Sequence, residues 1–314
     1  MYELSLIALI MPLIVGLLAG FIGSRINKSF THWMTTLGIF ISFAISCWIL
    51  IEIFLNPGLL LNQNIYEWMS IAGFNFKAGI LVDNLTASMM VVVTFISLMV
   101  HIYSIGYMRD DPGYHRFFCY ISLFTFAMLL LVISNNLLQL FFGWEGVGLM
   151  SYLLIGFWYK KESAIKANFK AFIVNRVGDM GLILGIAVIF SVIGSLDYQM
   201  IFDSSTELVN TKITIINDYS VSGITLACLL LFIGAMGKSA QMPLHVWLPD
   251  SMEGPTPISA LIHAATMVTA GVYMVARMSP LFELSSMALS VVLIVGATTA
   301  ICSGLLGIVQ FDIK

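Results

Sequence analysis

Charged side chains are scarce in this chain, and their scarcity excludes a water-soluble fold. Only 10% of the 314 residues are charged, whereas 59% are hydrophobic and the mean hydropathy is +0.97. Soluble domains carry about 25% charged residues, which they need to cover their surface. The formal net charge is only −3, so no basic surface for nucleic acid is expected. The partner that this composition predicts is the lipid bilayer.

Cysteine is also rare, and its spacing predicts no metal or disulfide framework. The four cysteines, Cys47, Cys119, Cys228 and Cys302, lie far apart in apolar runs, as small buried hydrophobic residues do. The sequence also lacks a P-loop, a cysteine cluster for iron–sulfur and a glycine-rich dinucleotide fingerprint. We therefore expect no cofactor and no metal in this chain, and any chemical energy has to come from another subunit.

Long apolar runs fill most of the sequence. A membrane-spanning helix needs about 20 mainly apolar residues, and by that rule we predict an all-α, polytopic membrane protein with about nine transmembrane helices. The predicted spans are Leu4–Gly23, Trp33–Phe54, Ile80–Tyr103, Arg116–Ile133, Leu137–Trp158, Ala171–Ile193, Gly223–Trp247, Pro257–Met278 and Ser285–Val309.

The distribution of lysine and arginine predicts that the N-terminus faces outward, because basic residues concentrate in cytoplasmic loops. With this orientation, only Lys77, Lys212 and Arg277 lie in the outside loops. The inside loops then hold Arg25, Lys28, Arg109, Arg116, Lys160, Lys161, Lys166, Lys170 and Lys314.

Glu145 is one of four ionisable residues inside the predicted spans that stand out as candidates. A charge at the centre of a spanning helix costs about 2.5–3.5 kcal/mol on insertion, so such residues are functional candidates. Glu145 lies about 12 Å into the fifth span, near mid-membrane, among Gly143, Gly146 and Gly148. We interpret it as a proton-carrying carboxylate; the alternative is a structural ion-pair partner.

Lys238 lies in the seventh span, five residues before Pro243. This proline removes the hydrogen bond to the carbonyl of Ser239 and is expected to break the helix. A broken helix at membrane depth survives where it is buried in protein or lines a wet cavity. A lysine withdrawn from water sheds its proton more readily, so Lys238 beside a break indicates an ion path. The alternative is a lysine that snorkels from a helix end.

His263 lies about 9 Å inside the eighth span, if Thr256 caps a helix that begins at Pro257. Histidine titrates near neutral pH and can relay protons. Thr266 and Thr269 share its neighbourhood and favour the relay, although a lone histidine is also common in packing.

Asp179, in the sixth span, follows Arg176 by three residues and shares its helical face. A local ion pair and a partner that tunes other charges are equally good interpretations.

Together these groups predict proton transfer through an electrostatic couple. Two unit charges 4 Å apart at an effective dielectric of 20 interact by about 4 kcal/mol, which is enough to drive a protonation switch. A charged Glu145 near Lys238 holds the lysine proton, and weakening that pair releases it.

Three segments resemble the L-subunit family of bacterial respiratory complex I, NADH:quinone oxidoreductase, and its mitochondrial chain 5 counterpart. They are Phe-Gly-Trp-Glu-Gly-Val-Gly within 141–158, Asn-Arg-Val-Gly-Asp-Met-Gly at 175–181, and Gly-Lys-Ser-Ala-Gln-Met-Pro-Leu-His-Val-Trp within 237–268. By this resemblance Glu145 is the essential glutamate of helix five and Lys238 the lysine of a broken helix seven. Asp179 and His263 match positions implicated in proton transfer.

The resemblance also implies an antiporter-like architecture of two inverted five-helix repeats. We expect helices one to three in residues 1–115, the first repeat in 116–280, and an incomplete second repeat in 281–314, since the family continues beyond the position of Lys314. It implies antiporter-like membrane subunits as partners, with NADH, FMN, iron–sulfur clusters and quinone bound in other subunits. The expected location is the bacterial inner membrane, or alternatively the mitochondrial inner membrane.

Two other functions compete with a proton-translocating subunit of this oxidoreductase. The first is the large subunit of a multi-subunit sodium/proton antiporter of the Mrp type, whose motifs are similar around Lys238. The second is a membrane scaffold without transport, which would gain nothing from the insertion cost of buried charges.

Overall fold

The computed structural model describes residues 1–25, 27–71, 74–216, 219–312 and 314. Within these residues, eight helices are long and apolar enough to cross a membrane. They are α1 (Tyr2–Phe21), α2 (Lys28–Leu55), α3 (Asn84–Tyr107), α4 (Tyr114–Val132), α5 (Leu137–Ile155), α6 (Glu162–Ile193), the continuous stretch Thr256–Arg277, and α13 (Ser286–Ile308). The seventh predicted span, Gly223–Trp247, contains a shorter apolar helix, α9 (Gly223–Lys238). The prediction of a polytopic helical membrane protein is confirmed.

The remaining elements connect the spans, except for α10, η4 and α11, which together form the span Thr256–Arg277. They are η1 (Gly23–Arg25), β1 (Leu61–Ile71), β2 (Phe74–Val82), α7 (Tyr198–Asp203), α8 (Ser205–Asn210), β3 (Lys212–Ile216), β4 (Tyr219–Ser222), η2 (Leu244–Trp247), η3 (Asp250–Glu253), α10 (Thr256–Ala260), η4 (Leu261–Ala265), α11 (Met267–Arg277) and α12 (Ser279–Phe282). The strands form two antiparallel hairpins, β1–β2 and β3–β4, which the sequence analysis did not predict.

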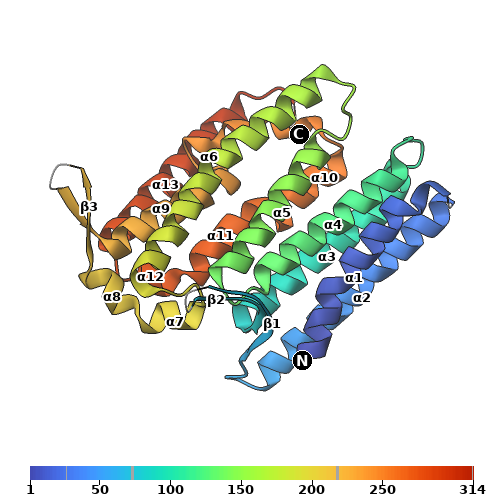
Figure 1. Ribbon diagram of the computed structural model, residues 1–314. Coiled ribbons are helices and arrows are strands. Elements are labelled where there is room, and N and C mark those ends of the chain that lie inside the picture. The colour runs from blue at the N-terminus through green and yellow to red at the C-terminus, as the bar shows by residue number, and fades with distance from the viewer. Residues whose placement is uncertain (26, 72–73, 217–218, 313) are drawn as a thin grey trace. The chain divides into compact units, whose positions relative to one another are not determined.

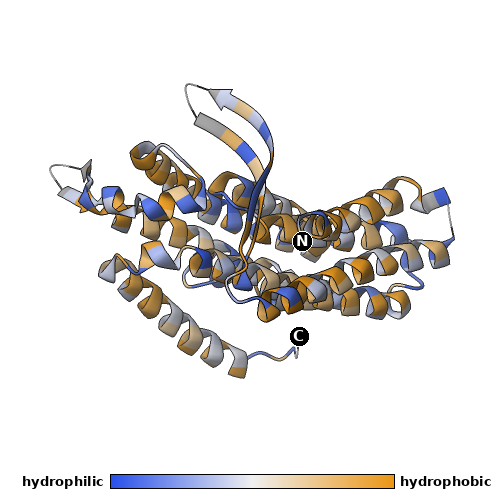
Figure 2. Cartoon of the chain, turned by 90° about the horizontal axis from the view of Figure 1, so that it is seen from below, coloured by the Kyte–Doolittle hydropathy of each residue, from blue (hydrophilic) through white to orange (hydrophobic). Residues whose placement is uncertain are grey.

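The chain divides into two compact units, one of residues 1–168 and 253–268 and the other of residues 169–252 and 269–314. In the first unit, α1 packs on α2 and α4, α2 packs on α3, and α4 packs on α5 (Figure 1). The spanning helices are coloured mainly hydrophobic in Figure 2, whereas the long β1–β2 hairpin carries more hydrophilic residues. In lipid a helix gains from apolar residues on all sides, which explains this pattern.

The third span begins later than predicted. Residues 80–82 belong to β2, and α3 begins at Asn84. The Asp83 side chain accepts a hydrogen bond of 2.8 Å from the Thr86 amide and so caps the helix. Ile80, Leu81 and Val82 are apolar, which is compatible with a buried strand as well as with a helix. The Asp83 cap fixes the start of the helix after these residues.

The eighth span also differs from the expectation. Its first helix, α10, begins at Thr256 and is preceded by Pro255, so Thr256 is not the capping residue. A π-helical segment, η4, then interrupts the span before α11. The Thr266 hydroxyl donates to the Leu261 carbonyl five residues earlier, at 2.7 Å, which fits this wider turn.

Candidate functional site

A contact between two glycines brings α6 and α9 together in the second unit. A Cβ atom on Gly178 would lie 2.9 Å from the Cα atom of Gly237, and one on Gly237 would lie 3.1 Å from the Cα atom of Gly178. No side chain fits between the backbones there, so only glycine permits this approach. The next residue on each helix is ionisable: Asp179 on α6 and Lys238 on α9. The glycine contact therefore positions an acid and a base opposite each other.

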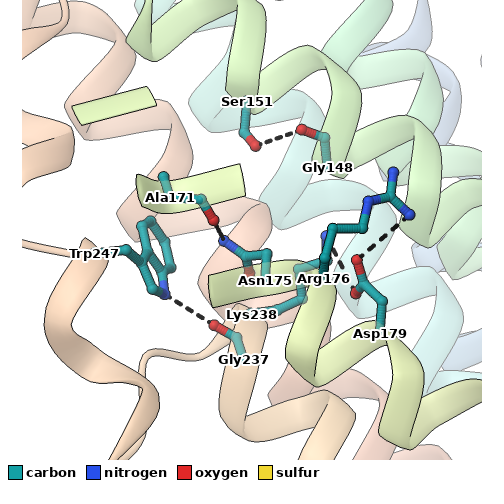
Figure 3. A network of polar contacts seen from close by, with 9 residues as sticks. All are labelled: Gly148, Ser151, Ala171, Asn175, Arg176, Asp179, Gly237, Lys238 and Trp247. Atoms are coloured by element: carbon teal, nitrogen blue, oxygen red, sulfur yellow. Dashed lines mark hydrogen bonds and ion pairs between the residues drawn. The ribbon is translucent and has the colours of Figure 1, made fainter. Parts of the chain in front are cut away.

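Asp179 lies between two cations (Figure 3). Its Oδ1 is 3.6 Å from Nζ of Lys238, and its Oδ2 is 3.8 Å from Nη1 of Arg176. The side chains of Lys238 and Asp179 are 1% and 4% exposed, whereas that of Arg176 is 43% exposed. Asp179 thus contacts Arg176 on its own helix and a second charge, Lys238, on α9; its role as a partner that tunes other charges stays a prediction.

Lys238 is the last residue of α9, as the predicted break requires. The backbone turns at Ala240, whose φ of 49° lies in the left-handed region. The helix-end carbonyls find new donors: the indole of Trp247 donates to Gly237 at 3.0 Å, and the amide of Gln241 donates to Met236 at 2.9 Å. The helix thus breaks at Ser239, four residues before the proline from which the break was predicted. The backbone carbonyls of Met236 and Gly237 at the end of the helix accept hydrogen bonds.

Glu145 occupies the position that the sequence predicted for it, in the first unit. It lies eight residues into the 19-residue helix α5, near its centre, and its side chain is half-buried. Two glycines beside it allow close packing on α4: a Cβ on Gly143 would lie 2.6 Å from the amide of Leu131, and one on Gly146 would lie 3.1 Å from the Cβ of Ala127. Glu145 therefore lies beside two glycines that let α5 pack closely on α4.

His263 lies in the π-helical segment η4 and is half-buried. In the first unit, η4 and α10 pack against α3. Single π-helical turns are rare and occur frequently at functional sites, which favours a functional histidine over a packing one.

Among the described residues, the buried histidine of α3 is a titratable group that the sequence motifs did not single out. His101, on α3, is fully buried; Nδ1 is 2.8 Å from the Ser97 carbonyl oxygen and Nε2 is 3.0 Å from Oγ of Ser122 on α4. Ser97 also contacts Thr125 of α4, with 2.6 Å between the two hydroxyl oxygens. His101 falls in the third apolar run, so the sequence contained a signal for it, but its partner Ser122 lies on another helix.

Beyond the break, two carboxylates bind to residues near the start of α6. Asp250 lies 2.8 Å from Nζ of Lys170, and the Ser163 hydroxyl donates to Glu253 at 3.1 Å. All four side chains are near the surface, so these contacts add little stability. Among the described residues, no three His, Cys, Asp or Glu side chains lie close enough to hold a metal ion.

Two family models match this chain. The model described as "NADH:quinone oxidoreductase/Mrp antiporter, TM" matches residues 134–314, which include Glu145, Asp179, Lys238 and His263. The model described as "NADH-Ubiquinone oxidoreductase (complex I), chain 5 N-terminus" matches residues 68–118.

Curated relatives are similar over nearly the whole chain. NADH-quinone oxidoreductase subunit L of Neisseria meningitidis is 56% identical over 99% of this chain and 46% of its own length. The same subunit of Rickettsia bellii is 49% identical, covering 100% of this chain and 49% of that relative. NADH-ubiquinone oxidoreductase chain 5 of Triticum aestivum is 50% identical over 98% of this chain and 46% of its own length. The chain thus spans about half the length of the relatives it matches.

One solved structure has the same fold. An Mrp complex from a Dietzia species aligns with a TM-score of 0.74 over 90% of this chain and 29% of that chain. The sequence identity is 22%, so this likeness shows a shared fold alone.

Proposed function

Because the chain belongs to the family of NADH:quinone oxidoreductase/Mrp antiporter membrane subunits, we propose that it carries protons across the membrane as part of an NADH:quinone oxidoreductase. The relatives at 49–56% identity are subunits of that oxidoreductase, and the Mrp structure shares only the fold. The observation that carries the proposal is the ion pair between Lys238 and Asp179, buried at the end of a broken membrane helix.

The competition of two cations for Asp179 supplies a switch. At these similar distances the Coulomb attraction at an effective dielectric of 20 is roughly 4 kcal/mol before screening. Water weakens the pair with the half-exposed Arg176 more than the pair with the buried Lys238. When the carboxylate moves toward Arg176, the ammonium of Lys238 loses attraction and releases its proton. When it moves toward Lys238, the ammonium is stabilised and holds the proton. A small movement of the Asp179 side chain thus changes whether Lys238 takes up or releases a proton.

Glu145 and His263 are the other proton-transfer groups of the proposal. The mid-helix carboxylate of Glu145 takes protons from or passes them to Lys238 through water, and the imidazole of His263 relays them onward. The division into helices one to three (1–115), a first repeat (116–280) and the start of a second repeat (281–314) belongs to the same proposal.

The energy for transport comes from partner subunits. We propose that neighbouring antiporter-like subunits bind this chain in the bacterial inner membrane and that NADH, FMN, iron–sulfur clusters and quinone are bound elsewhere in the complex. The N-terminus lies on the outer side, as the lysine and arginine distribution favours.

The test is proton pumping by variants of the full-length subunit within its complex. Lys238→Ala and Glu145→Ala should each reduce NADH-driven acidification of inverted vesicles at least tenfold, because each loses a titrating group. Lys212→Ala removes an exposed lysine at the start of β3 and should pump normally. Oxidation of NADH by an artificial electron acceptor reports assembly of the complex. Normal pumping by Lys238→Ala would refute the proposal.

A further inference from the structure

The first unit contains a groove of about 410 Å³ at the base of the β1–β2 hairpin. Its walls come from the hairpin and from α1, α4 and α5. Leu9, Ile133, Leu138 and Phe142 make one side almost wholly apolar. Tyr66, Trp68 and Lys77 of the hairpin line the other side. The groove is separate from Glu145, Lys238 and His263, none of which lines it.

The hairpin is fixed to the helices by hydrogen bonds, so the groove is preformed. The amide of Gly79 donates to Oε1 of Gln139 at 2.8 Å, and the amide of Leu81 donates to the carbonyl of Ile133 at 2.9 Å. The side-chain amide of Asn136 donates to the backbone carbonyl of Lys77 at 2.9 Å. These bonds tie β2 to the turn between α4 and α5 and hold Lys77 at the rim.

The groove lies at the ends of spanning helices, where lipid head groups meet the acyl region. It is lined at the last residues of α4 and the first turns of α5. Trp68 and Phe142 are about half exposed, with ring centroids 6.1 Å apart, and Tyr66 is 65% exposed. Aromatic side chains of this kind are enriched at the membrane–water boundary.

The charge at the rim selects the ligand. The ammonium of Lys77 lies 3.4 Å from Oε1 of Glu67, whose side chain is 53% exposed, so water screens this ion pair. An ammonium has three donors, so two remain for a phosphate oxygen. A cation beside an apolar groove at this level complements an anionic head group joined to an acyl chain.

We propose that this groove binds an anionic phospholipid, with one acyl chain against Leu138 and Phe142 and the phosphate on Lys77. A neutral lipid has the same acyl chain, but its head group carries no net negative charge to pair with the Lys77 ammonium. If a helix of a neighbouring subunit filled the groove, its apolar side chains would cover Lys77. Burying the ammonium in this way is costly unless the helix also supplies an acidic side chain. The bound lipid would cover the apolar side chains of α5 with its acyl chain and hold the hairpin at the membrane boundary through its head group.

The test measures lipid retained by the purified chain. The chain is reconstituted in vesicles of equal parts phosphatidylglycerol and phosphatidylcholine, extracted in mild detergent, and the lipid that remains is counted by native mass spectrometry. The wild type should retain phosphatidylglycerol preferentially. Lys77→Gln should reduce that preference about fivefold, as expected for one basic residue at a membrane surface.

Two further variants separate the groove from general effects. Leu138→Trp fills the groove and should reduce retention of both lipids. Lys212→Gln removes an exposed lysine from the other hairpin and should change nothing. Equal retention of the two lipids by the wild type, an equal effect of Lys212→Gln, or full retention by Leu138→Trp would each overturn the proposal. Lipid retained by the chain alone but absent from the assembled complex would show that a protein covers the groove, and would overturn it as well.

Discussion

At the scale of single residues, the decisive feature is that one carboxylate, that of Asp179, contacts two cations. Asp179 is almost completely buried, so its charge requires compensation, and both Lys238 and Arg176 lie within 4 Å of it. Arg176 cannot give up its proton, whereas lysine can. In the proposed switch, the arginine is therefore a constant charge that competes for the carboxylate, and Lys238 is the residue that takes up and releases the proton.

Replacing Lys238 by arginine tests whether proton release matters or charge alone. Lys238→Arg keeps a cation near Asp179, and the subunit should assemble, yet pumping should fall at least tenfold because a guanidinium stays protonated. The measurement is vesicle acidification per NADH oxidised. Pumping equal to that of the wild type would show that Lys238 acts only as a fixed positive charge.

At the scale of elements, the site depends on close approach of two helices. Gly178 and Gly237 leave no room for a side chain between α6 and α9. Gly181 continues the contact one turn later, where a Cβ would lie 2.6 Å from a side-chain carbon of Ile233. Because the ionisable residues directly follow Gly178 and Gly237, a change in helix separation changes the Asp179–Lys238 distance.

Gly178→Val should therefore damage the site without touching a charge. The added carbons force α6 and α9 apart, which costs about 1–3 kcal/mol of stability for overpacking. The expected results are a lower melting temperature in detergent and reduced pumping by the assembled complex. Gly296→Val, in α13 where nothing lies within 4 Å of an added Cβ, is the matched control. Equal melting temperatures of the two variants would contradict the role of the glycine contact.

At the scale of the whole molecule, each compact unit holds part of the proposed machinery. Glu145 and His263 belong to the first unit, and Asp179 and Lys238 belong to the second. The expected coupling of Glu145 to Lys238 stays a prediction, whereas the ion pair of Asp179 with Lys238 lies within one unit, with 3.6 Å between Oδ1 and Nζ.

The orientation in the membrane can be tested by reporter fusions. With the N-terminus outside, a reporter after Lys161 should be active in the cytoplasm, and one after Asp203, in the α7–α8 connection, should be external. An alkaline phosphatase and green fluorescent protein pair reports both sides. The reverse pattern would show that the orientation is inverted.

The sequence by itself determined the membrane class, the positions of the spans and the break at Lys238. These follow from local properties: hydropathy over about 20 residues, and a proline that removes a backbone donor. Its motifs also singled out Glu145, Asp179, Lys238 and His263 before any contact was visible.

Only the tertiary structure decided which of these residues meet. The pairing of Asp179 with Lys238 joins residues 59 positions apart (238 − 179) on two helices, and it depends on the glycine contact between them. His101 was missed for the same reason, since Ser122 lies on another helix. The π-helical turn at His263 and the β1–β2 hairpin likewise depend on packing against neighbouring segments, which hydropathy along one segment does not encode.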